Sequence, residues 1–90
     1  MTYLSKDLSV LAYANGFTLW HYTTEDSNED VEYTNYFTLA ADMLRVGDII
    51  VTNTSIEQKR PTSCMLLVNL NNKDVVEVHN MTTYTPKSME

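Results

Sequence analysis

The sequence predicts an α+β fold, mainly antiparallel β, in which a small partly closed barrel or sandwich carries one short helix. Three observations support this prediction. Residues 17–22 alternate as a strand does, residues 63–70 and 75–83 are two strand-like stretches separated by a polar turn, and one region has helical spacing of apolar side chains. With 90 residues there is room for one core, so residues 1–90 are expected to form a single domain.

Residues 17–22, FTLWHY, are the clearest predicted strand. A turn at Asn15-Gly16 precedes it, because both residue types tolerate a positive φ. Alternation places Phe17, Leu19 and His21 on one face and Thr18, Trp20 and Tyr22 on the other. Both faces are largely apolar, so we expect the strand to be covered on both sides within the domain, or on one side by another chain.

One helix is expected between residues 31 and 45, most clearly from Tyr36. Apolar side chains recur there at helical spacing, at Leu39, Ala40, Met43 and Leu44, and Thr34 or Asn35 could cap the start. Gly47 is expected to end the helix in a left-handed conformation, and Asp48 then leads into a strand at residues 49–52. The acidic stretch before the helix, residues 23–32, has no periodicity and is predicted to be a loop.

The second half of the chain predicts a hairpin. Residues 54–62 are a loop bounded by Pro61, and strands follow at 63–70 and 75–83. They are joined by a turn at residues 71–74, where asparagine is expected to take the left-handed positions that glycine usually takes. The polar tail at residues 85–90 is expected to be loose.

The first sixteen residues predict no definite helix or strand. They carry the apolar residues Leu4, Leu8, Val10, Leu11 and Tyr13 between polar ones. We therefore interpret residues 1–16 as an N-terminal contact arm that reaches a neighbouring chain and folds on contact.

The size of the chain favours association. A domain this short buries only roughly 60 to 65% of the surface that its unfolded chain exposes, so stability is expected to need support. Cys64 is the single cysteine, so an internal disulfide cannot form. Contacts with other chains are the remaining source of stability.

Charge and hydropathy exclude two classes of partner. The net charge is −6, and five of the twelve acidic residues lie at Glu25, Asp26, Glu29, Asp30 and Glu32. The six basic residues are scattered, so binding to a nucleic acid is not expected.

The longest apolar run, residues 64–68, is far short of the roughly 20 residues that cross a bilayer, so no membrane contact is expected. The N-terminus lacks the pattern of a signal peptide, and we expect a protein made in the cytosol.

No catalytic or cofactor pattern emerges from the residue types. Asp26, Asn28 and Asp30 match the first half of a calcium loop, but Val31 and Phe37 stand where that pattern needs glycine and glutamate. The possible zinc ligands, His21, His79 and Cys64, lie far apart. We therefore predict no enzyme, no metal site and no cofactor.

The aromatic residues Trp20, Tyr22, Tyr33, Tyr36 and Phe37 cluster within eighteen positions and allow two interpretations. They form the domain core, or some of them anchor contacts with other chains, as Trp and Tyr often do. The candidate interface residues are Leu4, Leu8, Val10, Leu11, Tyr13, Trp20, Tyr22 and Tyr36.

Three blocks of sequence form one module: GFTLWHY at 16–22, the Tyr36-Phe37 pair, and ADMLRVGDII at 41–50. This module resembles small virion proteins of tailed bacteriophages and covers about a third of the chain. The resemblance implies a capsid decoration or cement protein in the virion, made in the host cytoplasm. Its implied partners are the major capsid protein and copies of itself in a homotrimer or another small oligomer. Asn35 departs from the pattern, which usually has glycine before the Tyr-Phe pair.

Two other functions remain open at this point. A head-fibre or tail-fibre adaptor would also fit a virion protein. A soluble acidic adaptor or inhibitor could instead bind a host protein through the acidic residues 25–32, because localised negative charge can occupy a basic surface.

Overall fold

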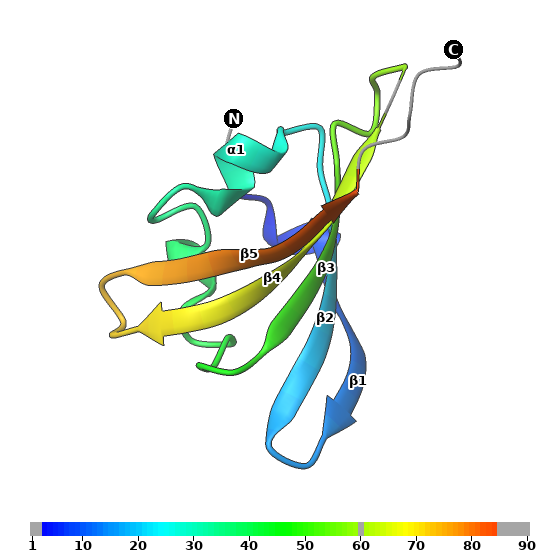
Figure 1. Cartoon of the computed structure of the whole chain (residues 1–90). Coiled ribbons are helices and arrows are strands. Elements are labelled where there is room, and N and C mark those ends of the chain that lie inside the picture. Colours follow the sequence, from blue (N-terminus) through cyan, green and yellow to red (C-terminus); the bar gives the residue numbers. More distant parts are fainter. Residues whose placement is uncertain (1–2, 60, 85–90) are drawn as a thin grey trace.

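A single five-stranded sheet dominates the computed structural model, which describes residues 3–59 and 61–84 (Figure 1). The strands are β1 (Leu8–Ala14), β2 (Phe17–Thr23), β3 (Ile49–Thr54), β4 (Thr62–Asn71) and β5 (Val76–Tyr84). They lie in the sheet in the order β1-β2-β3-β4-β5. The strands predicted at 17–22, 49–52, 63–70 and 75–83 are confirmed, with ends shifted by one or two residues. The predicted tail at residues 85–90 lies outside the described residues.

Most neighbouring strands run antiparallel, as predicted, but β2 and β3 run parallel. The described strands belong to one sheet that does not close on itself. The mainly antiparallel α+β prediction is therefore confirmed, whereas the partly closed barrel or sandwich is wrong. The sequence showed where strands occur, but no local signal showed how many sheets they would form.

The parallel pair requires a long crossover, residues 24–48, because the chain must return to the same end of the sheet before β3 begins. This crossover contains the helix α1 (Asn28–Glu32) and the short 3₁₀ helix η2 (Thr38–Ala40). It lies against one face of the sheet, where α1 packs on β4 and β5 and η2 packs on β5 (Figure 1). A second 3₁₀ helix, η1 (Ser5–Asp7), precedes β1.

The helix predicted between residues 31 and 45, most clearly from Tyr36, is wrong. The one α-helix among the described residues lies instead in the predicted acidic loop. The side chain of Ser27 accepts a hydrogen bond from the Asp30 amide, and the Asp30 carboxylate accepts one from the Ser27 amide. This capping box starts α1. Asn35 then adopts a positive φ of 83°, which breaks the chain direction before a longer helix can form. As a result Leu39, predicted on the buried side, is 82% exposed.

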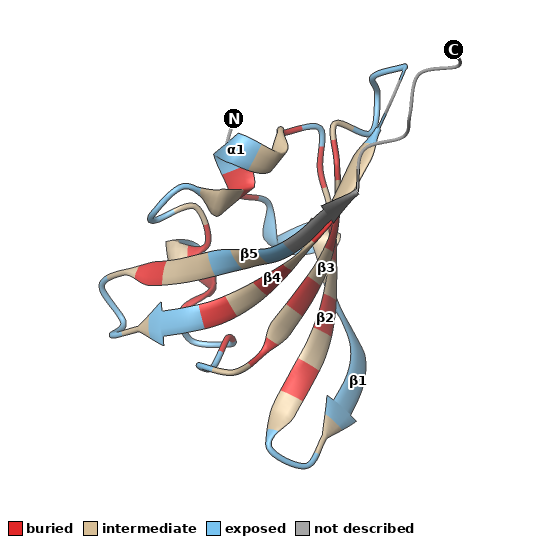
Figure 2. Cartoon of the chain, viewed as in Figure 1, coloured by how far each residue is buried: buried red, intermediate tan, exposed pale blue. Residues whose placement is uncertain are grey.

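The core lies between the sheet and the crossover. Burial alternates strictly along β2 and β3 (Figure 2). Every second side chain of these strands therefore faces the crossover. The buried apolar side chains are Tyr3, Trp20, Tyr22, Val31, Phe37, Ala40, Ala41, Leu44, Ile50, Cys64, Leu66, Val68 and Val76. The alternation predicted for residues 17–22 is confirmed, with Thr18, Trp20 and Tyr22 on the buried face.

Residues 8–14, left without an assignment by the sequence, form the edge strand β1. They pair with β2 through a tight turn in which Gly16 has a φ of 106°. A bulge between Val10 and Ala12 shifts the register, and most β1 side chains are exposed. The sequence pattern failed here because the bulge interrupts the alternation that identifies a strand.

The β4–β5 hairpin turn uses asparagine in a different way from the one predicted. Lys73, rather than an asparagine, has the positive φ of 78°. The Asn71 side chain accepts from the Lys73 amide, and the Asn72 side chain accepts from the amides of Asp74 and Val75. The asparagines therefore stabilise the turn through their side chains.

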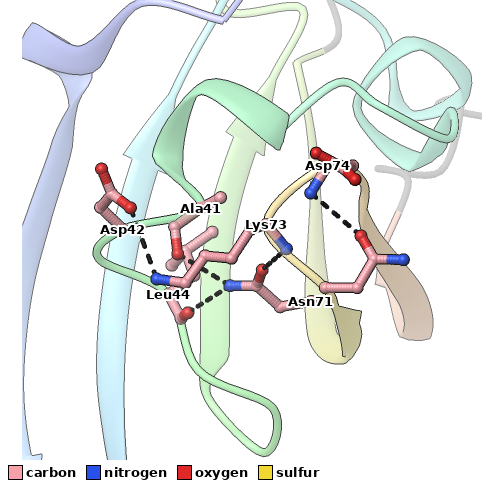
Figure 3. Close-up of polar contacts among 7 residues, drawn as sticks. Ala41, Asp42, Leu44, Asn71, Lys73 and Asp74 are labelled. Carbon is pink, nitrogen blue, oxygen red and sulfur yellow. Dashed lines mark hydrogen bonds and ion pairs between the residues drawn. The ribbon is translucent and has the colours of Figure 1, made fainter.

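Asn71 also joins this hairpin to the crossover (Figure 3). Its side-chain amide donates to the carbonyl oxygens of Ala41 and Leu44 at 2.8 and 2.7 Å. Both carbonyl oxygens lie near the end of the crossover, where no helical turn follows whose amides could donate to them. The nearby ion pair between Lys73 and Asp42 is exposed and is expected to contribute little.

We predict that Asn71→Ala lowers the free energy of unfolding by about 1–3 kcal/mol, because two partly buried carbonyls lose their donor. Urea unfolding followed by tryptophan fluorescence measures this. Asn69→Ala is the control, since Asn69 is an exposed residue on the same strand and should change stability by less than about 0.5 kcal/mol. Equal effects of the two substitutions would contradict the role of Asn71.

Candidate interaction surface

The carboxylate of Asp48 fixes one end of the predicted aromatic strand. It is buried and accepts hydrogen bonds from the Thr18 amide at 2.9 Å, the Trp20 indole at 3.0 Å and the Arg45 amide at 3.0 Å. Three donors compensate for moving this carboxylate out of water. Trp20, named above as a candidate interface residue, is thus a core residue that is 8% exposed.

A chain of hydrogen-bonded hydroxyl groups fixes the other end of β2, at Tyr22. The Tyr36 hydroxyl donates to the buried carboxylate of Asp26 at 2.6 Å. Burial, together with this hydrogen bond, raises the pKa of Tyr36 well above its ordinary value, so the group keeps its proton. Tyr22 must then donate to Tyr36, and its oxygen accepts from the Leu4 amide. Tyr22, another candidate interface residue, has no exposed surface at all.

The rings of Tyr3, Tyr22, Tyr36 and Phe37 pack together with centroids 5.0–6.5 Å apart. Most of these contacts are edge-to-face, the geometry that aromatic rings favour. Tyr36 is half-buried at the border of this cluster. For Trp20, Tyr22 and Phe37 the structure therefore agrees with the core interpretation, whereas Tyr33 is 74% exposed.

The remaining candidate interface residues lie at the surface, on or near β1. Leu8 is half-buried against the core, whereas Leu4, Val10, Leu11 and Tyr13 are exposed. Among the described strands β1 has a neighbour on one side only, so its outer edge presents free backbone groups. Exposed apolar side chains on a free edge are a typical site for another chain.

A second apolar surface lies on the sheet face opposite the crossover. Its residues, Leu19, Ile49, Val51, Met65 and Leu67, alternate with the buried ones and are half-buried. The registers bring Leu19, Ile49 and Leu67 into one row, and Val51 beside Met65. No described element covers this surface, which we call the open face. Sequence alternation had left open whether this face would be covered within the domain or by another chain.

Two cavities flank the acidic segment, and sequence analysis anticipated neither. The larger, about 310 Å³, is lined by Tyr3, Asp30, Tyr33, Thr34, Asn35, Tyr36 and Leu39. The smaller, about 200 Å³, is lined by Leu4, Lys6, Asp7, Thr23, Thr24, Glu25, Asp26 and Ile56. Both depend on how the N-terminal residues pack against the crossover, which no sequence spacing reveals.

The three residues that match the first half of a calcium loop make other contacts in the structure. Asp26 accepts from Tyr36, Asn28 accepts from Thr54, and Asp30 caps α1. The ring of His21 lies 3.0 Å from the Asn53 amide nitrogen. Within residues 3–59 and 61–84, no three His, Cys, Asp or Glu side chains converge where they could hold a metal ion. No helix in that part of the chain is long and apolar enough to span a membrane.

The chain matches no protein-family model, no curated protein and no solved structure. The resemblance to phage virion proteins therefore stays a prediction that rests on the module itself. In the structure the blocks of that module are joined, because Trp20 of the first block donates to Asp48 of the last. Six of the thirteen buried core residues belong to this module: Trp20, Tyr22, Phe37, Ala41, Leu44 and Ile50.

We predict that Cys64 reacts slowly with thiol reagents in the folded protein. Burial, with a smaller contribution from Glu32, raises the pKa of Cys64 to about 11, so the reactive thiolate is scarce at pH 8. The stabilisation linked to the protonated thiol is complete below a pH of about 8.5 and is lost as the pH rises toward 11. Alkylation with iodoacetamide at pH 8, followed by mass spectrometry, measures this. Labelling as fast in buffer as in urea would contradict the prediction.

Proposed function

We propose that this chain is a structural virion protein of a tailed bacteriophage, a capsid decoration or cement protein that stabilises the head shell through protein contacts. The proposal rests on the observation that the crossover covers only one face of the sheet. The crossover buries one face, while the open face and β1 present apolar side chains to solvent. A protein that works by contact needs such surfaces and no reactive group.

The two surfaces suit contacts of different kinds. The exposed β1 residues Val10, Leu11 and Tyr13 follow a free backbone edge, so hydrogen bonds and apolar contacts can form together. The open face carries the half-buried apolar residues of β2, β3 and β4, which suits packing against another layer of structure. Together they allow one chain to contact two neighbours, as a protein that bridges shell subunits must.

The partners we propose are the major capsid protein and further copies of this chain in a homotrimer. The two sheet edges, β1 and β5, lie at opposite ends of the strand order. An edge of one copy can therefore meet the other edge of the next copy, and such head-to-tail contacts close into a ring when the rotation permits. The resemblance of the module at 16–50 to virion proteins supports the same assignment. A head-fibre or tail-fibre adaptor would use the same surfaces.

One observation favours a second function, that of an acidic adaptor bound to a basic host protein. The neighbouring carboxylate of Glu57 raises the pKa of Glu25, with a smaller contribution from Asp26, so negative charges crowd together here. Binding through this charge would weaken as salt screens it, whereas apolar contacts through β1 would persist. Salt dependence of the measured affinity separates the two functions.

We predict that the purified chain is a trimer and that Leu11→Asp makes it a monomer, because a charge at a buried apolar contact is costly. Leu11 is 56% exposed within the chain, so the substitution should leave the melting temperature nearly unchanged. Multi-angle light scattering after gel filtration measures the mass.

The matched control is Leu70→Asp, since Leu70 is also partly exposed, at 38%, but lies on β4, which β2 and β3 separate from β1. This variant should remain a trimer. A wild-type monomer at micromolar concentration, or a trimer that Leu11→Asp leaves intact, would contradict self-association through β1. Substitution is preferable to deleting residues 1–14, because Tyr3 belongs to the core.

A further inference from the structure

The turn between β1 and β2 places an asparagine directly before a glycine. Asn15 and Gly16 form this turn and are both exposed (Figure 1). The chain contains eight asparagines, and the other seven precede residues that carry a side chain. Only at Asn15 does a side-chain amide stand next to a backbone nitrogen that no side chain shields.

The fold itself requires the glycine at this position. Ala14 and Phe17 pair directly across the turn, so Asn15 and Gly16 make the whole connection. Gly16 has a φ of 106°, whereas Asn15 does not have a positive φ. A turn with a positive φ only at its second central residue favours glycine there, because a side chain would be strained. The turn therefore keeps the residue that leaves Asn15 unshielded.

The surroundings of the turn leave both groups free. Neither the Asn15 side chain nor the Gly16 amide has a hydrogen-bond partner among the described residues. Apart from the chain neighbours of Gly16, no heavy atom lies within 4 Å of the position that its Cβ would take. The side-chain amide of Asn15 can therefore turn toward the Gly16 nitrogen without breaking a contact.

Asn72, in the β4–β5 turn, lies in the opposite situation. Its side-chain oxygen accepts hydrogen bonds from the amides of Asp74 and Val75, and Lys73 follows it. An exposed turn asparagine with an occupied side chain is thus present in the same molecule as an internal reference.

We propose that Asn15 is a site of spontaneous deamidation in the folded protein. The Gly16 nitrogen, after losing its proton to hydroxide, bonds to Cγ of Asn15, and the side-chain nitrogen leaves from Cγ as ammonia. Water then opens the resulting five-membered succinimide ring at one of its two carbonyl carbons. Opening at Cγ gives aspartate, and opening at the backbone carbonyl carbon gives isoaspartate, whose main chain runs through Cβ and Cγ. One water molecule is consumed and one ammonia molecule is released, without an oxidant, a metal ion or another protein.

The isoaspartate product changes the length of the turn. It adds one atom to the main chain between Ala14 and Phe17, and the register of a hairpin is fixed by the length of its turn. Among the described strands, β2 is the only neighbour of β1. We therefore expect isoaspartate at position 15 to loosen the pairing of β1 with β2 and to leave β3, β4 and β5 unchanged. This inference does not depend on a role in the virion.

The first test follows the full chain during incubation in H₂¹⁸O buffer, with peptide mass spectrometry as the measurement. Peptides that contain Asn15 should gain heavy oxygen sooner than peptides that contain Asn72, at a rate that rises in proportion to the hydroxide concentration. Asn15→Gln should lose the reaction, because a glutamine side chain must close a less favourable six-membered ring. Conversion of Asn15 no faster than that of Asn72, or at a rate indifferent to pH, would overturn the proposal.

The second test measures amide hydrogen exchange in the converted protein, after chromatographic separation of the isoaspartyl form. Residues 8–14 should lose protection in this form, while residues 62–71 keep theirs. Asn15→Asp is the matched control, since it carries the same added charge without the added main-chain atom, and it should exchange as the wild type does. Unchanged protection of β1 in the isoaspartyl form, or an equal loss in Asn15→Asp, would contradict the expected effect on the turn.

Discussion

The hydrogen bonds of the Asp48 carboxylate are the contacts on which the rest of the structure depends. The parallel pairing of β2 and β3 forces the chain through the crossover at residues 24–48, and such long connections are costly in chain entropy. Asp48 closes this connection, because it accepts from Thr18 and Trp20 on β2 and from Arg45 at the end of the crossover. The crossover between these contacts packs on one face of the sheet through α1 and η2, and no described element covers the open face.

The strands were predictable because their signals are local. Alternation along β2, the glycine turn at Gly16 and the polar hairpin at residues 71–74 each specify structure within a few residues. The helix was misplaced because two local signals competed. Apolar spacing favoured Tyr36 to Arg45, but the capping box of Ser27 and the left-handed Asn35 outweighed it. The asparagine-rich turn was located correctly, yet Lys73 took the strained position while the asparagine side chains accepted hydrogen bonds.

The candidate site was less predictable, because burial is decided by tertiary packing. Trp20, Tyr22 and Tyr33 belong to the same aromatic cluster in sequence, yet two are core residues and one is exposed. Tyr3 gave no signal at all, since it stands alone near the N-terminus, yet it belongs to the buried core and stacks on Tyr22. By contrast, an excess of apolar side chains in a segment without a clear element predicted Val10, Leu11 and Tyr13 to be contact residues, and the structure leaves these three side chains exposed. What the sequence missed was that this segment is itself a strand.

We propose that this fold acts as a rigid body that its neighbours hold, with its core on one side of the sheet and contact surfaces on the other side and along β1. Quantitative mass spectrometry of purified phage particles tests that claim most directly. The account predicts many copies of this polypeptide per particle, in a fixed ratio to the major capsid protein. Its absence from particles, in cells where the protein is abundant, would contradict the account.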